Sequence, residues 1–339
     1  MKKKMDLGYA YANARIKGMR SNLLDENAFR ELMQVKTLDE VTALLEQTPY
    51  KQDLVEASKN HSGVHRIDVA LHSNQARVIA KLSKILPAKG KVLFAMLASE
   101  WDAQNLKLVF SKKHLGQEIA REELMPTGKS FENFYAKLIA AKTLGEALEF
   151  AASKWGSRRF KAAARELAKK PDLKGAIAEI DAERARQLVL LAKNASDPLT
   201  RKIVEQQLAF ENAMAVLRLK KEGVKNAEKF VVYKNGAIAK ILQAQDFDEA
   251  VKQAALAFSL TPEQAAKAKE SLALLEIALE RKTVNSILAL TKMSVMSFAT
   301  AIGFVYLKKV EVSNLRKIAY ANAFGLKQEL GQYVFAINA

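Results

Sequence analysis

The chain has 339 residues, 49% of them hydrophobic, and no cysteine, which excludes a disordered chain, a disulfide framework and a thiolate metal site. Its 54 lysines and arginines exceed its 37 aspartates and glutamates, and a net charge of +17 favours anionic partners such as nucleic acid, lipid headgroups or acidic proteins. Apolar residues recur with helical spacing almost everywhere, and Arg184 is the one base in the stripe Ile177, Ile180, Arg184, Leu188 and Leu191. We therefore predict an all-α fold.

The first predicted elements lie near the N-terminus. Three lysines follow the initial methionine, but no apolar run comes after them, so we predict no secretory signal. Residues 35–41 (VKTLDEV) combine a small polar turn, the large apolar residue Leu38, Asp, Glu and an apolar helical run. The same arrangement returns at 141–147 (AKTLGEA) and 244–250 (AQDFDEA). We expect each copy to introduce a helix.

A second motif follows each copy of the first. It sets an acid, an asparagine and a base before a glycine: Asp102, Asn105, Lys107 and Gly116, then Glu311, Asn314, Arg316 and Gly325. The middle copy keeps Asn212 and Gly223 alone. We predict that the acid lies in the first turn of a helix, where it complements the free N–H groups, and that the glycine ends this helix. The bases Lys107 and Arg316 do not lie on the apolar face of the predicted helix, so their side chains should project toward solvent or a partner.

The common register of the two motifs indicates an internal triplication. The period is about 105 residues, which is the size of a small domain and far longer than a solenoid repeat. We predict three similar helical units, at residues 1–116, 117–223 and 224–339.

Signals for catalysis are weak. Residues 128–130 (GKS) resemble the end of a phosphate-binding loop, but Glu123 stands where that loop needs its first glycine, so we predict a polar loop. His61 and His65 are separated by Gly63 and have no acidic ligand at zinc-site spacing. We predict no catalytic residue, no metal site and no cofactor.

The densest basic stretch, residues 154–174, includes Arg158, Arg159, Lys161 and Arg165. Trp155 and Phe160 lie within it, as a base-stacking surface would require. The alternative is a solvated helix face whose two aromatic rings point into the core, and we favour it because charge runs usually face solvent.

One segment, residues 293–307 (MSVMSFATAIGFVYL), is long and uncharged enough to be considered as a membrane span. A spanning helix needs roughly 20 apolar residues, and this segment has 15, three of them Ser or Thr. We predict a buried core helix and no transmembrane segment.

Two terminal motifs resemble a known family. Residues 8–15 (GYAYANAR) with 19–24 (MRSNLL), and residues 311–318 (EVSNLRKI) with Gly325, are similar to the N- and C-terminal motifs of the C subunit of archaeal-type (A/V-type) rotary ATPases, which is homologous to the d subunit of the vacuolar enzyme. The length and the repeat agree, so the resemblance covers nearly the whole chain.

The resemblance implies a funnel of three helical domains about a pseudo-threefold axis. Such a protein is a non-catalytic central-stalk adaptor that rests on the membrane proteolipid ring at the cytoplasmic face and receives the tip of the rotor shaft in its cavity. Anionic lipid headgroups are further expected partners of the basic surface, and nucleic acid is not expected. We hypothesise that Lys107, Arg316, Asn105, Asn212 and Asn314 line or support the cavity. The alternative is a basic, all-helical nucleic-acid-binding protein.

Overall fold

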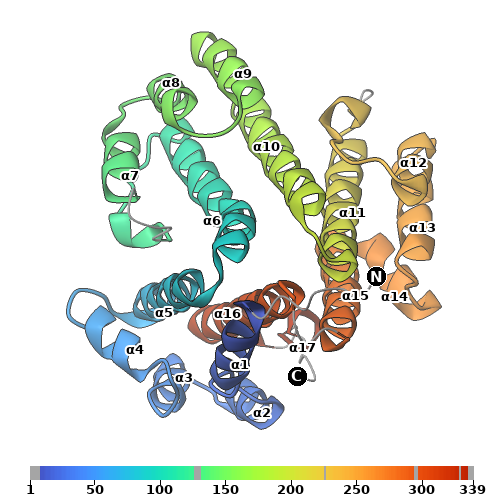
Figure 1. Ribbon diagram of the computed structural model, residues 1–339. Coiled ribbons are helices and arrows are strands. Elements are labelled where there is room, and N and C mark those ends of the chain that lie inside the picture. The colour runs from blue at the N-terminus through green and yellow to red at the C-terminus, as the bar shows by residue number, and fades with distance from the viewer. Residues whose placement is uncertain (1–7, 126–130, 225–226, 294–296, 328–329, 335–339) are drawn as a thin grey trace.

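The computed structural model describes residues 8–125, 131–224, 227–293, 297–327 and 330–334, and this part of the chain is helical without a β-strand (Figure 1). The all-α prediction is confirmed. The loop predicted at 128–130 lies outside the described residues.

After α1 (Gly8–Arg20), three short helices and then two long ones follow one another, and this order recurs along the described chain. The first set is α2 (Glu26–Gln34), α3 (Leu38–Leu45), α4 (Lys51–Ala57), α5 (Gly63–Ile85) and α6 (Ala88–His114). The second is α7 (Phe131–Ala140), α8 (Leu144–Lys154), α9 (Arg158–Lys169), α10 (Leu173–Asn194) and α11 (Pro198–Lys221). The third is α12 (Gly236–Gln243), α13 (Phe247–Ala257), α14 (Pro262–Glu270), α15 (Leu272–Lys292) and α16 (Ala299–Phe324). The 3₁₀ helices η1 (Arg121–Glu123) and η2 (Ala227–Phe230) come between the sets, and α17 (Leu330–Tyr333) ends the described chain.

The first motif starts a helix in all three copies, as predicted. Thr37, Thr143 and Asp246 are the N-caps of α3, α8 and α13, and each side chain accepts a hydrogen bond from the backbone N–H of the glutamate three residues later. That glutamate accepts in turn from the N–H that precedes the cap, as Glu40 does from Lys36 at 2.6 Å. Each cap is worth about 1 kcal/mol.

The glycines of the second motif end their helices, which confirms that prediction. Gly116, Gly223 and Gly325 follow the last turns of α6, α11 and α16 with φ of 65°, 71° and 72°. This left-handed conformation is favourable for glycine because it has no Cβ.

The acids of the second motif do not lie in first turns, so that prediction is wrong. Asp102 and Glu311 stand in the middle of α6 and α16. Each accepts a hydrogen bond from a tyrosine of the short helices and their connections: Tyr135 donates to Asp102 at 3.0 Å and Tyr50 to Glu311 at 2.6 Å. The apolar run after each acid looked like a new helix, although it continues a helix that began more than ten residues earlier.

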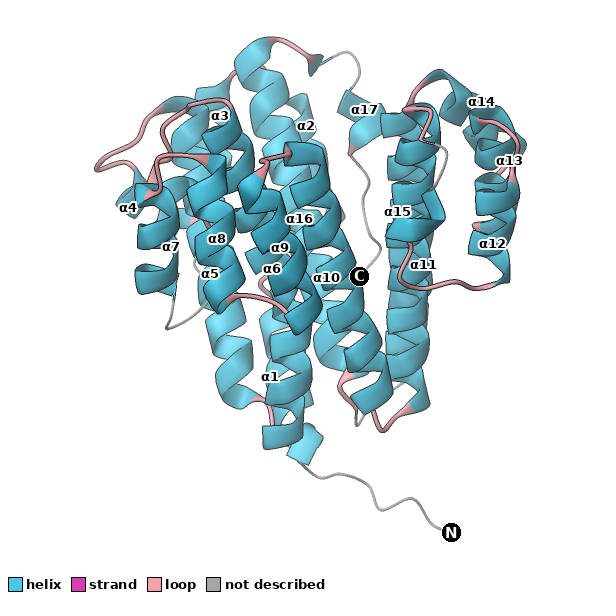
Figure 2. Cartoon of the chain, turned by 90° about the horizontal axis from the view of Figure 1, so that it is seen from above, coloured by secondary structure: helices cyan, strands magenta, loops and turns pink. Residues whose placement is uncertain are grey.

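The long helices form a closed ring. Contacts join α5 to α6, α6 to α10, α10 to α11, α11 to α15, α15 to α16, and α16 back to α5 (Figure 1). At one end of this ring lie the turns between paired long helices: the first at residues 86–87, the second at 195–197, and the third between α15 and α16, of which residues 293 and 297–298 are described. We call it the closed end, and it is the lower end of the view in Figure 2. Leu86, Leu191 and Phe298 beside these turns belong to one buried cluster, which also holds one face of α1.

Toward the other end, each long helix that closes a set packs outward against the short helices of the next set. Leu106 and Phe110 of α6 lie in a buried cluster with residues of α7 to α10, and Met214 and Leu217 of α11 with residues of α12, α13 and α15. Leu315 of α16 lies among residues of α2 to α5. The hydrophobic clusters therefore cross the boundaries predicted at 116/117 and 223/224, and the last long helix completes the cluster of the first short helices.

Residues 299–307 of the uncharged segment considered as a membrane span form the start of α16, and residues 294–296 of it lie outside the described residues. Ile302, Phe304 and Val305 are buried in the central cluster, as predicted for a core helix. Within the described residues, none of the helices combines the length and the apolar character that crossing a bilayer requires.

Close packing of α15 on α16 depends on one glycine. A Cβ on Gly303 would lie 2.7 Å from Cγ2 and 2.9 Å from Oγ1 of Thr291, whereas a Cβ on Gly18 in α1 would meet nothing within 4 Å. We expect Gly303→Ala to lower the free energy of unfolding by about 1–3 kcal/mol through this overlap. Gly18→Ala should leave stability unchanged or raise it by up to about 1 kcal/mol, because alanine is the better helix former.

Thermal unfolding followed by circular dichroism measures both variants. The additional change Thr291→Ala should restore part of the stability lost in Gly303→Ala, because it removes both overlapping atoms. An equal melting temperature for Gly303→Ala and Gly18→Ala would contradict the contact.

Candidate functional site: the central cavity

The ring of long helices surrounds a cavity of about 1230 Å³, and α5, α6, α10, α11, α15 and α16 all contribute to its wall. Much of this wall is ionic, since acidic and basic side chains reach it from neighbouring helices. The cavity is the candidate functional site because it is large and is built by the whole chain.

Among the ion pairs of the described residues, three join neighbouring long helices at or one turn beyond the position of the second-motif base. Lys107 of α6 pairs with Asp181 of α10. Arg316 of α16 pairs with Asp68 of α5 at 2.9 Å, and Asp68 also accepts from Tyr320. The predicted bases thus reach the cavity wall, each beside an acid of the adjacent helix. Because Lys107 and Arg316 are 32% and 43% exposed, such a pair contributes at most about 1 kcal/mol.

The middle copy makes the third bridge with a residue that the sequence reasoning missed. Met214 occupies the place of the base and is buried in the core, but Arg218, one turn further along α11, pairs with Glu276 of α15 at 2.6 Å. Residues i and i+4 share a face of a helix, so a search one turn beyond the expected position finds this base.

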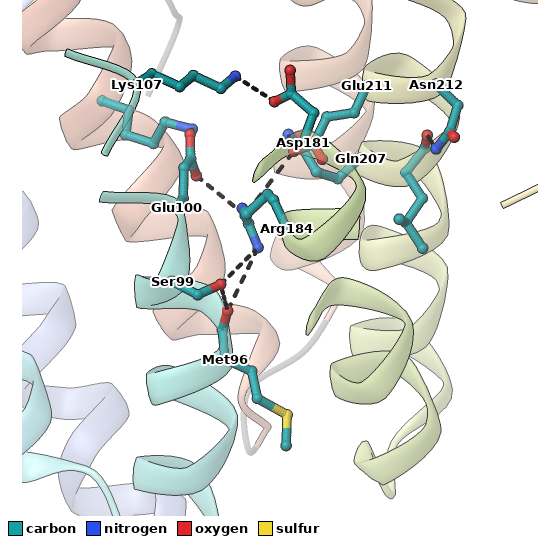
Figure 3. Close-up of polar contacts among 11 residues, drawn as sticks. Met96, Ser99, Glu100, Lys107, Asp181, Arg184, Gln207, Glu211 and Asn212 are labelled. Carbon is teal, nitrogen blue, oxygen red and sulfur yellow. Dashed lines mark hydrogen bonds and ion pairs between the residues drawn. The ribbon is translucent and has the colours of Figure 1, made fainter. Parts of the chain in front are cut away.

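A second group of charged side chains lies in the cavity, about two helical turns nearer the closed end than Lys107 and Arg316. We call Glu100, Arg184, Glu211 and Lys309 the inner ionic cluster; they come from α6, α10, α11 and α16. Figure 3 labels Glu100, Arg184 and Glu211. Lys309 pairs with Glu100, and Arg184 lies 3.3 Å from Glu100 and 4.0 Å from Glu211. Arg184 was not among the predicted site residues; a base within the apolar stripe of α10 is the sequence signal that could have found it.

The two carboxyl groups of the cluster differ in their proton affinity. Burial raises the pKa of Glu211, and the attraction of Arg184 offsets this in part. Burial acts in the same direction on Glu100, but the charges of Lys309 and Arg184 outweigh it and hold the pKa of Glu100 below its ordinary value. Burial also raises the pKa of Glu280, which lines the cavity from α15.

The asparagines of the second motif are buried, and the contacts of two of them, Asn105 and Asn212, brace the wall. Asn105 donates to the carbonyl of Met125 at 2.7 Å and accepts from its N–H at 2.9 Å, which fixes the segment after η1. Asn212 accepts from the N–H of Val232 after η2 at 3.2 Å. Asn314 is 1% exposed in α16. Asn105 and Asn212 also contribute to the cavity lining.

The predicted basic surface lies outside the cavity. Arg158, Arg159 and Arg165 are exposed on α9, and Lys161 is half-buried. Ser157 donates to Glu183 of α10, so α9 begins halfway along that helix, on the outer wall. Phe160 is buried and meets Trp155 edge to face at 4.7 Å, so these rings pack on the core as the favoured interpretation predicted.

His72 lies apart from the pair formed by His61 and His65. His61 and His65 lie edge to face at the start of α5, with Gly63 between them at a φ of 58°. His72 lines the cavity, where burial lowers its pKa. In the part of the chain that the structure describes, His, Asp and Glu form no group of three that could hold a metal ion.

The opposite shifts in the inner ionic cluster predict opposite effects of the same substitution. The lowered pKa of Glu100 stabilises the fold above its unfolded-state pKa, and this contribution is lost as the pH falls through the folded-state value. The raised pKa of Glu211 favours the protonated form, and its contribution is lost as the pH rises through the folded-state value. At pH 7 we therefore expect Glu100→Gln to lower the melting temperature and Glu211→Gln to raise it.

The differences in melting temperature between each variant and the parent protein should shrink toward pH 3, where a protonated carboxyl and an amide carry the same charge. Melting temperatures of the two variants and the parent protein between pH 3 and 8 measure this. Parallel curves for the two variants would contradict the assigned shifts.

Known proteins resemble this sequence over most of its length. The family model of the ATP synthase (C/AC39) subunit matches residues 12–332. The C subunit of the A-type ATP synthase of Desulfurococcus sp. is 28% identical over 95% of this chain and 88% of its own length, and that of Archaeoglobus fulgidus 25% over 95% and 94%. The corresponding protein of Thermococcus kodakarensis is 35% identical over 140 residues, which are 41% of this chain and 37% of that protein. The chain therefore belongs to the family of C/AC39 subunits of ATP synthases.

Proposed function

We propose that this chain is a non-catalytic central-stalk subunit of an A/V-type rotary ATPase, which couples the rotor shaft to the membrane proteolipid ring during ion-driven rotation. In this proposal it is a peripheral protein at the cytoplasmic face of the membrane, a funnel of three similar helical units about a pseudo-threefold axis. Membership of the family supports the assignment to the complex. The recurring order of short and long helices supports the three units.

The observation that carries the proposal is the cavity inside a closed ring of helices. A volume of about 1230 Å³ accommodates roughly three turns of a single helix, given a helix diameter of about 10 Å with side chains. Because each long helix contacts two neighbours around the ring, a torque applied inside the cavity is distributed over the whole chain. This is what an adaptor between a shaft and a ring requires, and it needs neither a cofactor nor a reaction.

The predicted site residues take specific parts in this proposal. Lys107 and Arg316, joined by Arg218, present basic groups on the cavity wall to the inserted shaft. Asn105, Asn212 and Asn314 support that wall from within. The bases of α9 (Arg158, Arg159, Lys161 and Arg165) meet acidic loops of partner proteins on the outer wall.

The nucleic-acid alternative gains no support from the basic stretch. The two aromatic rings that would stack on bases pack against the core. Without them this stretch provides charge alone, which gives salt-sensitive and unspecific binding.

Co-purification of the tagged chain from gently solubilised membranes of its own organism tests the assignment. We expect catalytic ATPase subunits, stalk subunits and proteolipid, with about one copy of the chain per complex. Recovery of ribosomal or nucleoid proteins that disappear after nuclease treatment would instead establish the alternative.

Charge reversal at the cavity wall tests the docking residues. Lys107→Glu with Arg316→Glu should weaken capture of the purified shaft proteins about tenfold or more, because it removes two bases and leaves their acidic neighbours unpaired. Helicity by circular dichroism should stay unchanged, since both pairs are partly exposed.

A swapped pair separates docking from stability. Lys107→Asp combined with Asp181→Lys keeps an ion pair between α6 and α10 but reverses its direction. If Lys107 contacts the shaft, the swap weakens capture while the melting temperature is retained. Unchanged capture in both variants would remove these residues from the site.

A further inference from the structure

The closed end of the ring carries a surplus of exposed positive charge. Basic side chains flank each of its turns: Lys84, Lys89 and Lys91 at the first, Lys193 and Lys202 at the second, and Lys292 at the third. All six are exposed, and none of them has an ion-pair or hydrogen-bond partner among the described residues. On the cavity wall, by contrast, Lys107, Arg218 and Arg316 each lie beside an acid.

Acidic residues are nearly absent from the same segments. The sequence has no Asp or Glu between residues 69 and 99, which includes the first turn, or between residues 281 and 310, which includes the third. At the second turn, Asp197 accepts from the N–H of Thr200 as the N-cap of α11. The bases beside the turns of the closed end therefore outnumber the acids there.

Large apolar side chains lie exposed among these bases. Met293 beside the third turn is 72% exposed and Val92 beside the first is 56% exposed. Tyr11 in the first turn of α1 is 62% exposed, and its neighbour Tyr9 packs against Gly90 near the first turn. Apolar side chains among lysines suit the boundary between lipid headgroups and acyl chains, where Tyr is also favoured.

We infer that the closed end binds directly to the headgroups of anionic phospholipids, with Lys84, Lys89, Lys193, Lys202 and Lys292 as the charged contacts. The turns present their bases at one end of the ring, as a bilayer surface requires, and do not converge on a groove that would hold a strand of nucleic acid. This inference goes beyond the proposed function, because it concerns the lipid itself and applies to the purified chain outside any complex. It also assigns lipid contact to the closed end and not to the basic face of α9.

Vesicle binding of the full chain tests this inference. The probes are vesicles of pure phosphatidylcholine and of phosphatidylcholine with 30 mol% phosphatidylglycerol, at 0.1 M salt. We expect binding to the anionic vesicles alone and its loss at 0.5 M salt. The variant Lys84→Gln/Lys89→Gln/Lys193→Gln/Lys202→Gln should bind at least a hundredfold more weakly, since each lysine near an anionic surface is worth about a fivefold change.

A matched variant removes the same charge elsewhere. Lys154→Gln/Arg158→Gln/Arg159→Gln/Arg165→Gln neutralises four exposed bases at or beside α9, and both variants change the net charge from +17 to +13 (17 − 4). We expect it to keep vesicle affinity within a few-fold of the parent chain. Replacing Met293 and Val92 with serine should weaken binding to a smaller extent, without changing its salt dependence.

Several results would overturn the inference. Equal losses in the two fourfold variants would mean that net charge alone governs binding, and equal affinity for both vesicle types would remove the headgroup charge from the contact. A closed-end variant that loses affinity for a DNA duplex but keeps its vesicle binding would assign this surface to nucleic acid. Capture of the shaft proteins by the same variants reports separately on the proposed function.

Discussion

The fold depends on the contact between the last long helix and the first short helices. Without α16, the cluster formed by α2 to α5 lacks one wall, and the ring of long helices stays open. The contact includes buried charge: Glu311 accepts from Tyr50 at 2.6 Å, from Lys308 at 2.7 Å and from the N–H of Leu24 at 2.6 Å. Burying an ion pair is costly unless its hydrogen bonds are satisfied, so this arrangement specifies which surfaces meet more than it adds stability.

Closure of the ring creates the cavity because each long helix uses different faces at its two ends. In α6, Leu93, Leu97 and Trp101 are buried toward the closed end, whereas Leu106 and Phe110 are buried against the short helices. At 3.6 residues per turn, the centres of these two apolar faces lie roughly half a turn apart around the helix axis. The helix packs inward at the closed end and outward beyond it, which leaves its inner face polar.

α11 follows the same plan: Val204 and Leu208 join the central cluster, and Ala213 and Leu217, roughly half a turn away around the helix axis, join an outer one. The polar inner faces explain why charges gather in the cavity and why they are paired there. An unpaired charge between helices would be desolvated without any compensating attraction, and Lys107, Arg218 and Arg316 each have an acid on the adjacent helix. At the closed end the side chains face solvent, and no such pairing is required.

The sequence alone determined the helical class, the helix starts at Thr37, Thr143 and Asp246, and the helix ends at Gly116, Gly223 and Gly325. These features follow from contacts within a few residues, namely caps and the conformational freedom of glycine, so they can be read locally. The terminal motifs at residues 8–24 and 311–325 also indicated the family.

The tertiary structure alone decided where the acids of the second motif lie and which charges meet in the cavity. Asp102 and Glu311 looked like the starts of helices, because the change of apolar face halfway along α6 and α16 interrupts the pattern that marks a continuous helix. Arg184 is the one base in the stripe of α10, but its partners Glu100 and Glu211 come from other helices and are distant in the sequence. Local signals fix the conformation of the backbone, whereas the pairing of distant charges follows from which helix faces pack together.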